Sequence, residues 1–253
     1  MVLSRLAKKL GDTRRAPPSA PPGLRIYAIG DVHGRLDLLD RLSAKIAADL
    51  ARGTFDRTLT IFLGDLIDRG PSSAGVVERL ESANFPTPIV ALRGNHEELL
   101  LNFLKDATVL ESWRRFGALE TLHSYGVDIG AAARGARFEE TRRELAAKLP
   151  PAHLRFLEQT QLTEERGGYF FVHAGVRPQV PLDAQRRDDL LWIREEFLRF
   201  EGDYGKFIVH GHTPTPEPEV RRNRINIDTG AFATSVLTAL VLEGEERRFL
   251  DTR

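Results

Sequence analysis

Short apolar stretches that end at glycine recur along the chain from residue 24 onward. Each apolar run is four to eight residues long and rich in Ile, Val, Leu and Phe, which is typical of buried β-strands. We expect strands within LRIYAIG (24–30), TLTIFLG (58–64), TPIVALRG (87–94), GGYFFVHAG (167–175), KFIVHG (206–211), RINIDTG (224–230) and VLTALVLEG (236–244).

Helical patterns separate several of these strands. Leu39, Leu42, Ile46 and Leu50 fall on one face of a predicted helix that stops at Gly53. The chain between residues 97 and 161 has a largely helical pattern. Strands that alternate with helices, followed by further strands near the C-terminus, predict an α/β fold with mixed sheets. We expect one domain over residues 24–253, with a helical insertion at about 97–161.

Residues 1–23 differ from the rest of the chain, because they are basic and then rich in proline and alanine. Leucines at helical spacing within residues 1–10 allow a short surface anchor for anionic lipid or a partner. The alternative is a disordered tail that ends in a stiff proline linker. We favour the tail over the whole of 1–23, since isolated amphipathic signals of this length are weak.

The amino-acid composition limits which metal ligands and which binding partners the protein can have. Lys and Arg number 36 and Asp and Glu number 36, a balance that favours neither nucleic acid nor a membrane surface. No apolar run reaches the length of a membrane span, and the first residues lack the apolar core of a secretory signal, so we expect a cytoplasmic protein. There is no cysteine, so a metal would be held by His, Asp, Glu or Asn.

Five of the apolar stretches lead into polar side chains that can bind metals or phosphate. Ligands in open α/β sheets bind outside the carboxyl ends of the strands, so we expect these side chains to meet at one edge. Neighbouring glycines let the chain turn sharply there. The side chains are Asp31 and His33 after the first stretch, Asp65, Asp68 and Arg69 after the second, Asn95, His96 and Glu97 after the third, His173 in the fourth, and His210 and His212 at the fifth.

The mixture of carboxylate, carboxamide and imidazole suits manganese, iron or zinc. One catalytic metal with an open position does not need so many ligands, whereas two metals that share a bridging carboxylate would use them all. His210 and His212 alternate with period two and would face the same side of an extended strand, so the residues alone leave the choice between them open. From the residues alone, the candidate ligands are Asp31, His33, Asp65, Asn95, His173 and one of His210 and His212.

The order of these blocks resembles a known family. GDVHG (30–34), GDLIDRG (64–70), GNHE (94–97), HAG (173–175) and GHTP (211–214) are similar to the signature blocks of the phosphoprotein phosphatases, in their bacterial and phage form. These belong to the calcineurin-like metallophosphoesterase superfamily. The resemblance spans about residues 24–245 and implies a sandwich of two mixed β-sheets flanked by α-helices.

The resemblance also implies a role for each matching residue. Asp31 and His33 would hold the first metal, Asp65 would bridge both, and Asn95, His173 and His212 would hold the second. It selects His212 over His210 as the ligand. His96 would be the general acid, oriented by Asp68, while Arg69 and Asn95 would contact the substrate phosphate.

A second phosphate-binding arginine is expected between the fourth and fifth blocks. We choose Arg194 in DDLLWIREEF, because phage members carry an arginine after a similar tryptophan segment. Arg177, Arg186 and Arg187 are alternatives nearby, and Arg194 could also be a solvated helix charge.

The function that follows is hydrolysis of phosphomonoesters in proteins, mainly phosphoserine and phosphothreonine with phosphotyrosine as a further option. Two divalent ions, manganese foremost and iron or zinc as alternatives, would carry a bridging hydroxide that attacks phosphorus in line. The substrate would be a phosphorylated protein or a small phosphate ester.

Two rival interpretations differ from a protein phosphatase. Symmetrical diadenosine tetraphosphatases share GDxHG, GDL and RGP, and DRGPSS (68–73) is compatible with them. Glu97 and Thr213–Pro214 nevertheless favour a phosphomonoesterase. A binding scaffold without catalysis would be expected to lack a ligand or the His96–Asp68 pair, and this chain has them all.

Overall fold

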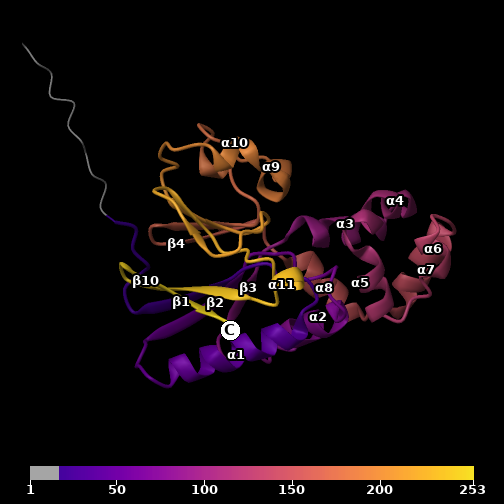
Figure 1. Cartoon of the computed structure of the whole chain (residues 1–253), viewed down its shortest axis with the longest axis horizontal. Coiled ribbons are helices and arrows are strands. Elements are labelled where there is room, and N and C mark those ends of the chain that lie inside the picture. Colours follow the sequence, from indigo (N-terminus) through magenta and orange to yellow (C-terminus); the bar gives the residue numbers. More distant parts are fainter. Residues whose placement is uncertain (1–16) are drawn as a thin grey trace, which may run out of the picture.

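The computed structural model describes residues 17–253, which form two β-sheets packed face to face between layers of helices (Figure 1). The first sheet has the strand order β10-β9-β1-β2-β3 and the second has the order β4-β5-β6-β8-β7. The strands of the first sheet are β1 (Leu24–Ile29), β2 (Arg57–Phe62), β3 (Ile89–Ala91), β9 (Thr238–Glu243) and β10 (Glu246–Asp251). Those of the second are β4 (Thr163–Arg166), β5 (Tyr169–Val172), β6 (Phe207–His210), β7 (Glu219–Val220) and β8 (Arg224–Asn226).

Both sheets are mixed, as the sequence predicts. In the first sheet β1, β2 and β3 run parallel, while β9 and β10 are antiparallel to their neighbours. In the second sheet β5, β6 and β8 run parallel, and β4 and β7 close the edges in antiparallel register. Each parallel set brings its carboxyl ends to one edge of its sheet, and the polar residues noted above follow those ends.

Helices cover the outer faces of both sheets (Figure 1). One group packs on the first sheet and extends into the helical segment of residues 97–161, and α9 and α10 lie against the second sheet. The helices are α1 (Leu36–Leu50), α2 (Ser73–Glu81), α3 (Asn95–Phe103), α4 (Leu110–Trp113), α5 (Ala118–Ser124), α6 (Gly130–Ala133), α7 (Phe138–Lys148), α8 (Pro151–Gln159), α9 (Arg187–Trp192), α10 (Glu195–Leu198) and α11 (Ala231–Thr234). Single 3₁₀ turns are η1 (Ala107–Val109), η2 (Arg114–Phe116) and η3 (Leu182–Ala184).

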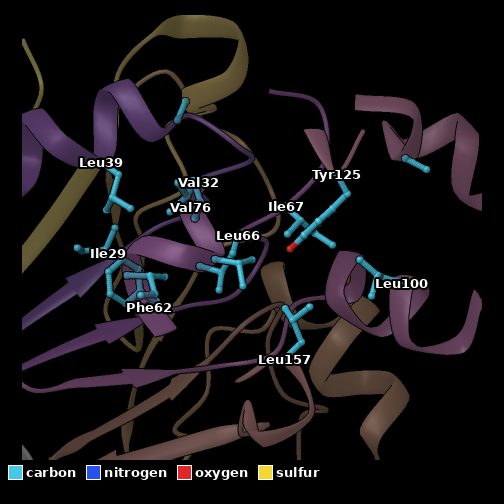
Figure 2. Close-up of a cluster of buried hydrophobic side chains, with 14 of the residues drawn as sticks. Ile29, Val32, Leu39, Phe62, Leu66, Ile67, Val76, Leu100, Tyr125 and Leu157 are labelled. Carbon is cyan, nitrogen blue, oxygen red and sulfur yellow. The ribbon is translucent and has the colours of Figure 1, made fainter. Parts of the chain in front are cut away.

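The alternation of side chains along β1 divides the core into layers. Ile26 and Ala28 point between the sheets, whereas Tyr27 and Ile29 point toward the helices. Figure 2 shows the helix side of this core, a cluster that contains Phe62 from β2 and residues of α1, α2 and α3. Apolar burial on both faces of β1 and β2 holds the loops that follow them in fixed positions.

Residues 17–23 pack on the domain, whereas the sequence predicts a disordered tail over 1–23. The Tyr169 hydroxyl donates to the Pro18 carbonyl at 3.1 Å, and the Ala20 amide donates to the Gly244 carbonyl at 2.8 Å. Ala20 is itself buried between the sheets. The remainder of the predicted tail and the anchor considered for residues 1–10 lie outside the described residues. Among residues 17–253, every helix is too short or too polar to span a bilayer.

Candidate dinuclear metal centre

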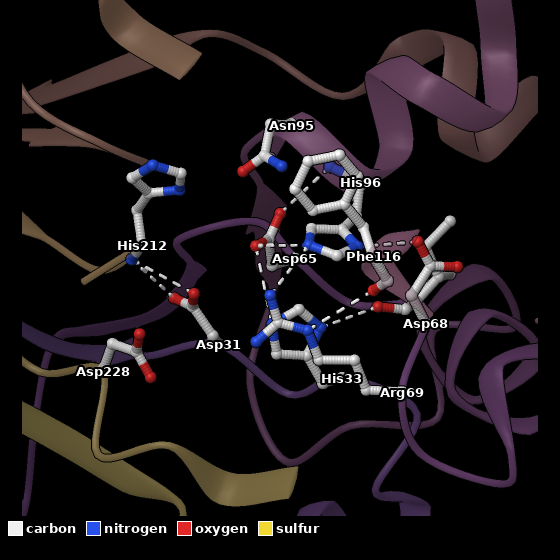
Figure 3. A network of polar contacts seen from close by, with 12 residues as sticks. Asp31, His33, Asp65, Asp68, Arg69, Asn95, His96, Phe116, His212 and Asp228 are labelled. Atoms are coloured by element: carbon white, nitrogen blue, oxygen red, sulfur yellow. Dashed lines mark hydrogen bonds and ion pairs between the residues drawn. The ribbon is translucent and has the colours of Figure 1, made fainter. Parts of the chain in front are cut away.

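The polar residues that follow the strands converge at one edge of the sandwich (Figure 3). Several of them have a left-handed backbone, which costs free energy for a residue other than glycine and is typical of functional sites. The non-glycine residues of these loops with positive φ are His33, Asp65, Asp68, Arg69 and His212.

The Asp65 carboxylate lies at the centre of this cluster. Its Oδ2 is 3.6 Å from His33 Nε2 and 3.6 Å from His96 Nε2, and its Oδ1 is 3.3 Å from His173 Nε2. Burial alone would raise its pKa, but the surrounding imidazoles, His173 foremost, lower it. An ionised carboxylate with an oxygen toward each side can bridge two cations.

Gly94 and Glu97 hold Asp65 in this position. A Cβ on Gly94 would meet Asp65 Oδ1 at 2.1 Å, so only glycine allows the approach. The buried Glu97 carboxylate accepts hydrogen bonds from the amides of Asp65, Leu66 and Gly94 at 2.8–2.9 Å. Burial, and after it the Asp65 charge, raise the pKa of Glu97 to about 7. Glu97 is therefore a support of the loop, a role that the sequence analysis did not assign.

The first candidate ligand group is built on His33 and Asp65, whose ligand atoms lie within 4.8 Å of each other and of a ring nitrogen of His96, the expected general acid. The Nδ1 of His33 lies 2.9 Å from the Ile67 carbonyl, so it carries the proton and leaves the Nε2 lone pair facing Asp65. Burial lowers the pKa of His33 to about 3, which keeps the ring neutral. A backbone carbonyl behind a neutral imidazole is the usual support of a metal-binding histidine.

The second candidate ligand group contains Asp65, His173 and His212. His173 is held like His33, because its Nδ1 lies 2.9 Å from the Leu63 carbonyl. Its Nε2 lies 3.0 Å from Asn95 Oδ1 and 3.1 Å from His212 Nδ1. Burial lowers the pKa of both histidines, that of His212 to about 2. Neutral nitrogens and amide and carboxylate oxygens crowded together away from water form a donor set that fits a divalent cation.

Asp31 lies beside these two groups and pairs with a residue that the sequence analysis did not select. Its carboxylate accepts the His212 backbone amide at 3.1 Å and faces Asp228, which follows β8 (Figure 3). Burial raises the pKa of Asp31, and the charges of Asp228 and Asp65 raise it further. Burial likewise raises the pKa of Asp228 to about 6. Two adjacent buried carboxyls would be stabilised by a cation, which supports Asp31 as a ligand.

The sequence pattern could have indicated Asp228 as a site residue. It occupies the same position after an apolar stretch, in RINIDTG, as the other site residues do. Its Oδ1 accepts the Gly230 amide at 2.9 Å, which fixes the carboxyl toward Asp31.

His210 and His212, which the residue pattern could not separate, have different environments. The Nε2 atom of His210 lies 3.2 Å from Arg224 Nη1. Burial lowers the pKa of His210 to about 3. It packs edge to face on Phe197 and belongs to neither ligand group.

His96 is held by a fully buried carboxylate. Its Nδ1 lies 2.6 Å from Asp68 Oδ2, and the same carboxylate accepts hydrogen bonds from Trp113 Nε1 at 2.6 Å and from the Thr121 hydroxyl. Burial by itself lowers the pKa of His96, but the charges of Asp65 and Asp68 outweigh it and raise the pKa. A protonated His96 with Nε2 toward the cluster is suited to donate a proton. Trp113 takes part in holding Asp68 through its N–H.

Two arginines reach the cluster from opposite sides. Arg69 Nη2 lies 3.5 Å from His96 Nε2, and Arg194 Nε lies 3.2 Å from His212 Nε2. The alternatives to Arg194 have other positions: Arg177 binds Asp189 and Glu196, Arg187 binds Glu98, and Arg186 lies 3.9 Å from Asp188 with a largely exposed side chain. Arg194 is therefore the candidate of this segment that the fold brings to the cluster.

The chain is similar in sequence to a family of known phosphoesterases. The family model for calcineurin-like phosphoesterases matches residues 24–231. A bis(5′-nucleosyl)-tetraphosphatase PrpE (asymmetrical) from Halalkalibacterium halodurans is 27% identical over 231 residues, which cover 84% of this chain and 87% of the relative. The crystal structure of a candidate diadenosine tetraphosphatase superposes with a TM-score of 0.64 at 20% identity, over 94% of this chain and 98% of the other. A cold-active protein tyrosine phosphatase variant superposes with a TM-score of 0.53 at 16% identity, over 91% and 83%.

The two-sheet sandwich and the buried ligand groups at its edge define a metal-dependent phosphoesterase. The chain belongs to the calcineurin-like phosphoesterase family, whose members use a dinuclear divalent metal site. The superfamily named from the sequence motifs is thus confirmed. The narrower likeness to phosphoprotein phosphatases is not supported by the curated relatives, which are named as nucleotide tetraphosphatases.

Proposed function

We propose that this protein hydrolyses dinucleoside polyphosphates, cleaving one phosphoanhydride bond asymmetrically. The observation that carries the proposal is the buried Asp65 cluster with Arg69 and Arg194 beside it, a site for a phosphate chain of high negative charge. The names of the relatives support the nucleotide, because they are asymmetrical tetraphosphatases. The sequence motifs favoured a protein phosphatase over a diadenosine tetraphosphatase, and the proposal made here favours the nucleotide substrate instead.

Glu97 no longer argues for a phosphomonoesterase. Its carboxylate is buried and occupied by backbone amides, so it does not reach a substrate. Glu97 therefore supports the Asp65 loop, and its identity does not distinguish a phosphomonoester substrate from a nucleotide substrate.

The proposed roles follow from the geometry. Asp31, His33 and Asp65 would hold one cation, and Asp65 with Asn95, His173 and His212 would hold the other; we expect manganese, with iron or zinc as alternatives. Two bound cations would supply Lewis acidity toward the phosphoryl oxygens. Arg69 and Arg194, with Asn95, would bind the oxygens of the scissile phosphate and offset their developing charge.

His96 would complete the reaction. The oxygen of a water molecule bonds to phosphorus and gives up one proton to the solvent, while the bridging P–O bond on the opposite side breaks. His96, held by Asp68, passes the proton on Nε2 to the departing phosphate oxygen. A dinucleoside tetraphosphate and water thus become a nucleoside triphosphate and a nucleoside monophosphate.

A substrate panel on metal-analysed protein tests the proposal. Diadenosine tetraphosphate should be hydrolysed to ATP and AMP, whereas phosphoserine, phosphothreonine and phosphotyrosine peptides should react more slowly. EDTA should abolish the activity and manganese should restore it. Formation of two ADP molecules, faster turnover of a phosphopeptide, or activity that survives complete removal of metal would each contradict the proposal.

A protein phosphatase remains the second candidate function. The fold is shared with a protein tyrosine phosphatase, although at 16% identity. The phosphopeptides in the same panel decide between the two. The cytoplasmic location stays a prediction from the sequence.

A further inference from the structure

Two partly exposed aromatic side chains flank the candidate metal centre. Phe116 at the end of η2 is 36% exposed, and Trp192 at the end of α9 is 38% exposed. Single exposed apolar side chains are normal, but two aromatic rings that contact each other beside a polar site form a patch suited to an apolar ligand. We refer to Phe116 and Trp192 as the aromatic pair.

The aromatic pair spans both halves of the site. The ring of Phe116 meets His96 edge to face with centroids 6.1 Å apart, and Trp192 meets His212 in the same way at 6.2 Å. The two rings lie 5.9 Å from each other at 63°. They form a two-sided corner next to the proposed acid and the second ligand group, and Figure 3 shows Phe116 at the His96 side.

Neighbouring contacts anchor the backbone that carries both rings. Phe116 precedes Gly117, whose φ of 102° and contact with the Arg69 backbone tolerate no side chain, and Arg69 donates its amide to the Gly117 carbonyl at 3.2 Å. Trp192 ends a helix that is tied to α3 by Arg187, which donates to Glu98 at 3.0 Å. A rigid aromatic surface binds a flat ligand at low entropic cost.

Phe232 is a third exposed aromatic residue near the site, but its position differs. The Arg69 guanidinium carbon lies 4.5 Å from the centre of its ring, so a cation already covers that face. Phe232 therefore supports the phosphate-binding arginine, and the aromatic pair is left as the surface for a planar ligand.

We propose that Phe116 and Trp192 form a nucleobase subsite, in which the base of the nucleotide at the cleaved phosphate stacks on Trp192 and meets the edge of Phe116. This inference rests on the proposed function and names the part of the substrate that it recognises. The base lies one ribose away from the phosphate that Arg69 and Arg194 hold. Every nucleobase has a π-face and can stack on Trp192. The subsite would therefore favour nucleotides over phosphates that lack a base, and it would not distinguish adenine from other bases.

Kinetics on substrates with and without a base test the subsite. Trp192→Ala and Phe116→Ala should each raise the KM for diadenosine tetraphosphate by about 5- to 150-fold, the range that loss of one stacked base contact corresponds to. Trp192→Phe should retain most of the affinity. The kcat should stay close to wild type, and so should the KM for inorganic tripolyphosphate, which has the anhydride but no base. Phe249→Ala is the matched control, since Phe249 is 39% exposed on β10.

Fluorescence gives a readout that does not depend on turnover. The chain has two tryptophans, and Trp113 is fully buried, so a quencher in solution reports on Trp192. AMP should quench this emission, ribose 5-phosphate should not, and Trp192→Phe should abolish the response.

The outcomes separate the subsite from the proposed function. Normal hydrolysis of diadenosine tetraphosphate by both alanine variants would overturn the subsite and leave the function standing. Base-dependent quenching in a protein that does not hydrolyse the dinucleotide would support the subsite and overturn the function. Absence of both hydrolysis and quenching would overturn both.

Discussion

Replacing Trp113 by Phe would test whether the helical segment contributes to the His96–Asp68 pair. The substitution removes the indole N–H that lies 2.6 Å from Asp68 Oδ2 and retains an aromatic ring against Phe103, whose centroid is 5.4 Å away. Asp68 is fully buried, so no water can replace the lost donor directly. His96 and Thr121 then remain as its side-chain donors.

The size of the effect follows from the charge of the acceptor. A hydrogen bond to a charged group stabilises by about 1.5–3 kcal/mol, whereas one between neutral groups stabilises by about 0.5–1.5 kcal/mol. Trp113→Phe should therefore lower the free energy of unfolding by about 1.5–3 kcal/mol in the wild type. At about 2–4 °C per kcal/mol for a chain of this size, the midpoint should fall by about 3–12 °C.

A double-mutant cycle isolates this contact from lost packing. In an Asp68→Asn background the acceptor is neutral, so Trp113→Phe should cost about 1 kcal/mol less than in the wild type. The assay is thermal and urea denaturation of the metal-free proteins, followed by circular dichroism. Thr141→Val is a control for a buried hydroxyl in the same segment that donates to a backbone carbonyl away from the site. Equal costs of Trp113→Phe in both backgrounds would refute the proposed hydrogen bond.

Three further substitutions test the parts of the site separately. Asp65→Asn should lose most of its Mn²⁺ affinity in calorimetry, because the carboxylate shared by both ligand groups becomes neutral; a variant that retains two ions would disprove the bridging role. His96→Asn should keep its metals and slow the turnover of alkyl phosphate esters by about 10²–10⁴-fold. Aryl esters should be slowed less, because their leaving groups need less protonation. Equal losses on the two kinds of ester would count against His96 as the general acid. Glu97→Gln should lower the free energy of unfolding by about 2 kcal/mol and weaken metal binding, because the buried backbone amides around Asp65 lose a carboxylate acceptor. Glu120→Gln, on the exposed face of α5, is the control and should change neither quantity.

The fold was predictable because its central strands are buried on both faces. The parallel strands β1, β2, β5 and β6 are mostly apolar and mostly buried, and each corresponds to a predicted strand. The strands that the pattern missed are β4, β7 and β10, which have polar sequences such as TEER and ERRFLD. They lie at or next to the sheet edges, where one face meets solvent and the apolar signal is lost.

The candidate site was predictable only as far as its residues follow strands. Asp31, Asp65 and His173 stand out because carboxylates and imidazoles beside buried runs need compensation. Asp228 has the same signal and was passed over. Glu97 was noted as part of a motif, but its function as an acceptor for backbone amides depends on a loop that lies about 30 residues away in sequence.

The sequence by itself determined which residue types stand at the strand ends, because turns and strand ends are set by local preferences of the chain. The tertiary structure decided which of them share a site. His210 and His212 are two residues apart and chemically identical, yet one ring faces Arg224 and the other faces His173, since the chain turns at Gly211 with φ of 65° at His212. Phe116 from η2 and Trp192 from α9 meet from helical segments about 75 residues apart, and no local pattern of the sequence records that contact. It depends on how the two sheets and their helices pack.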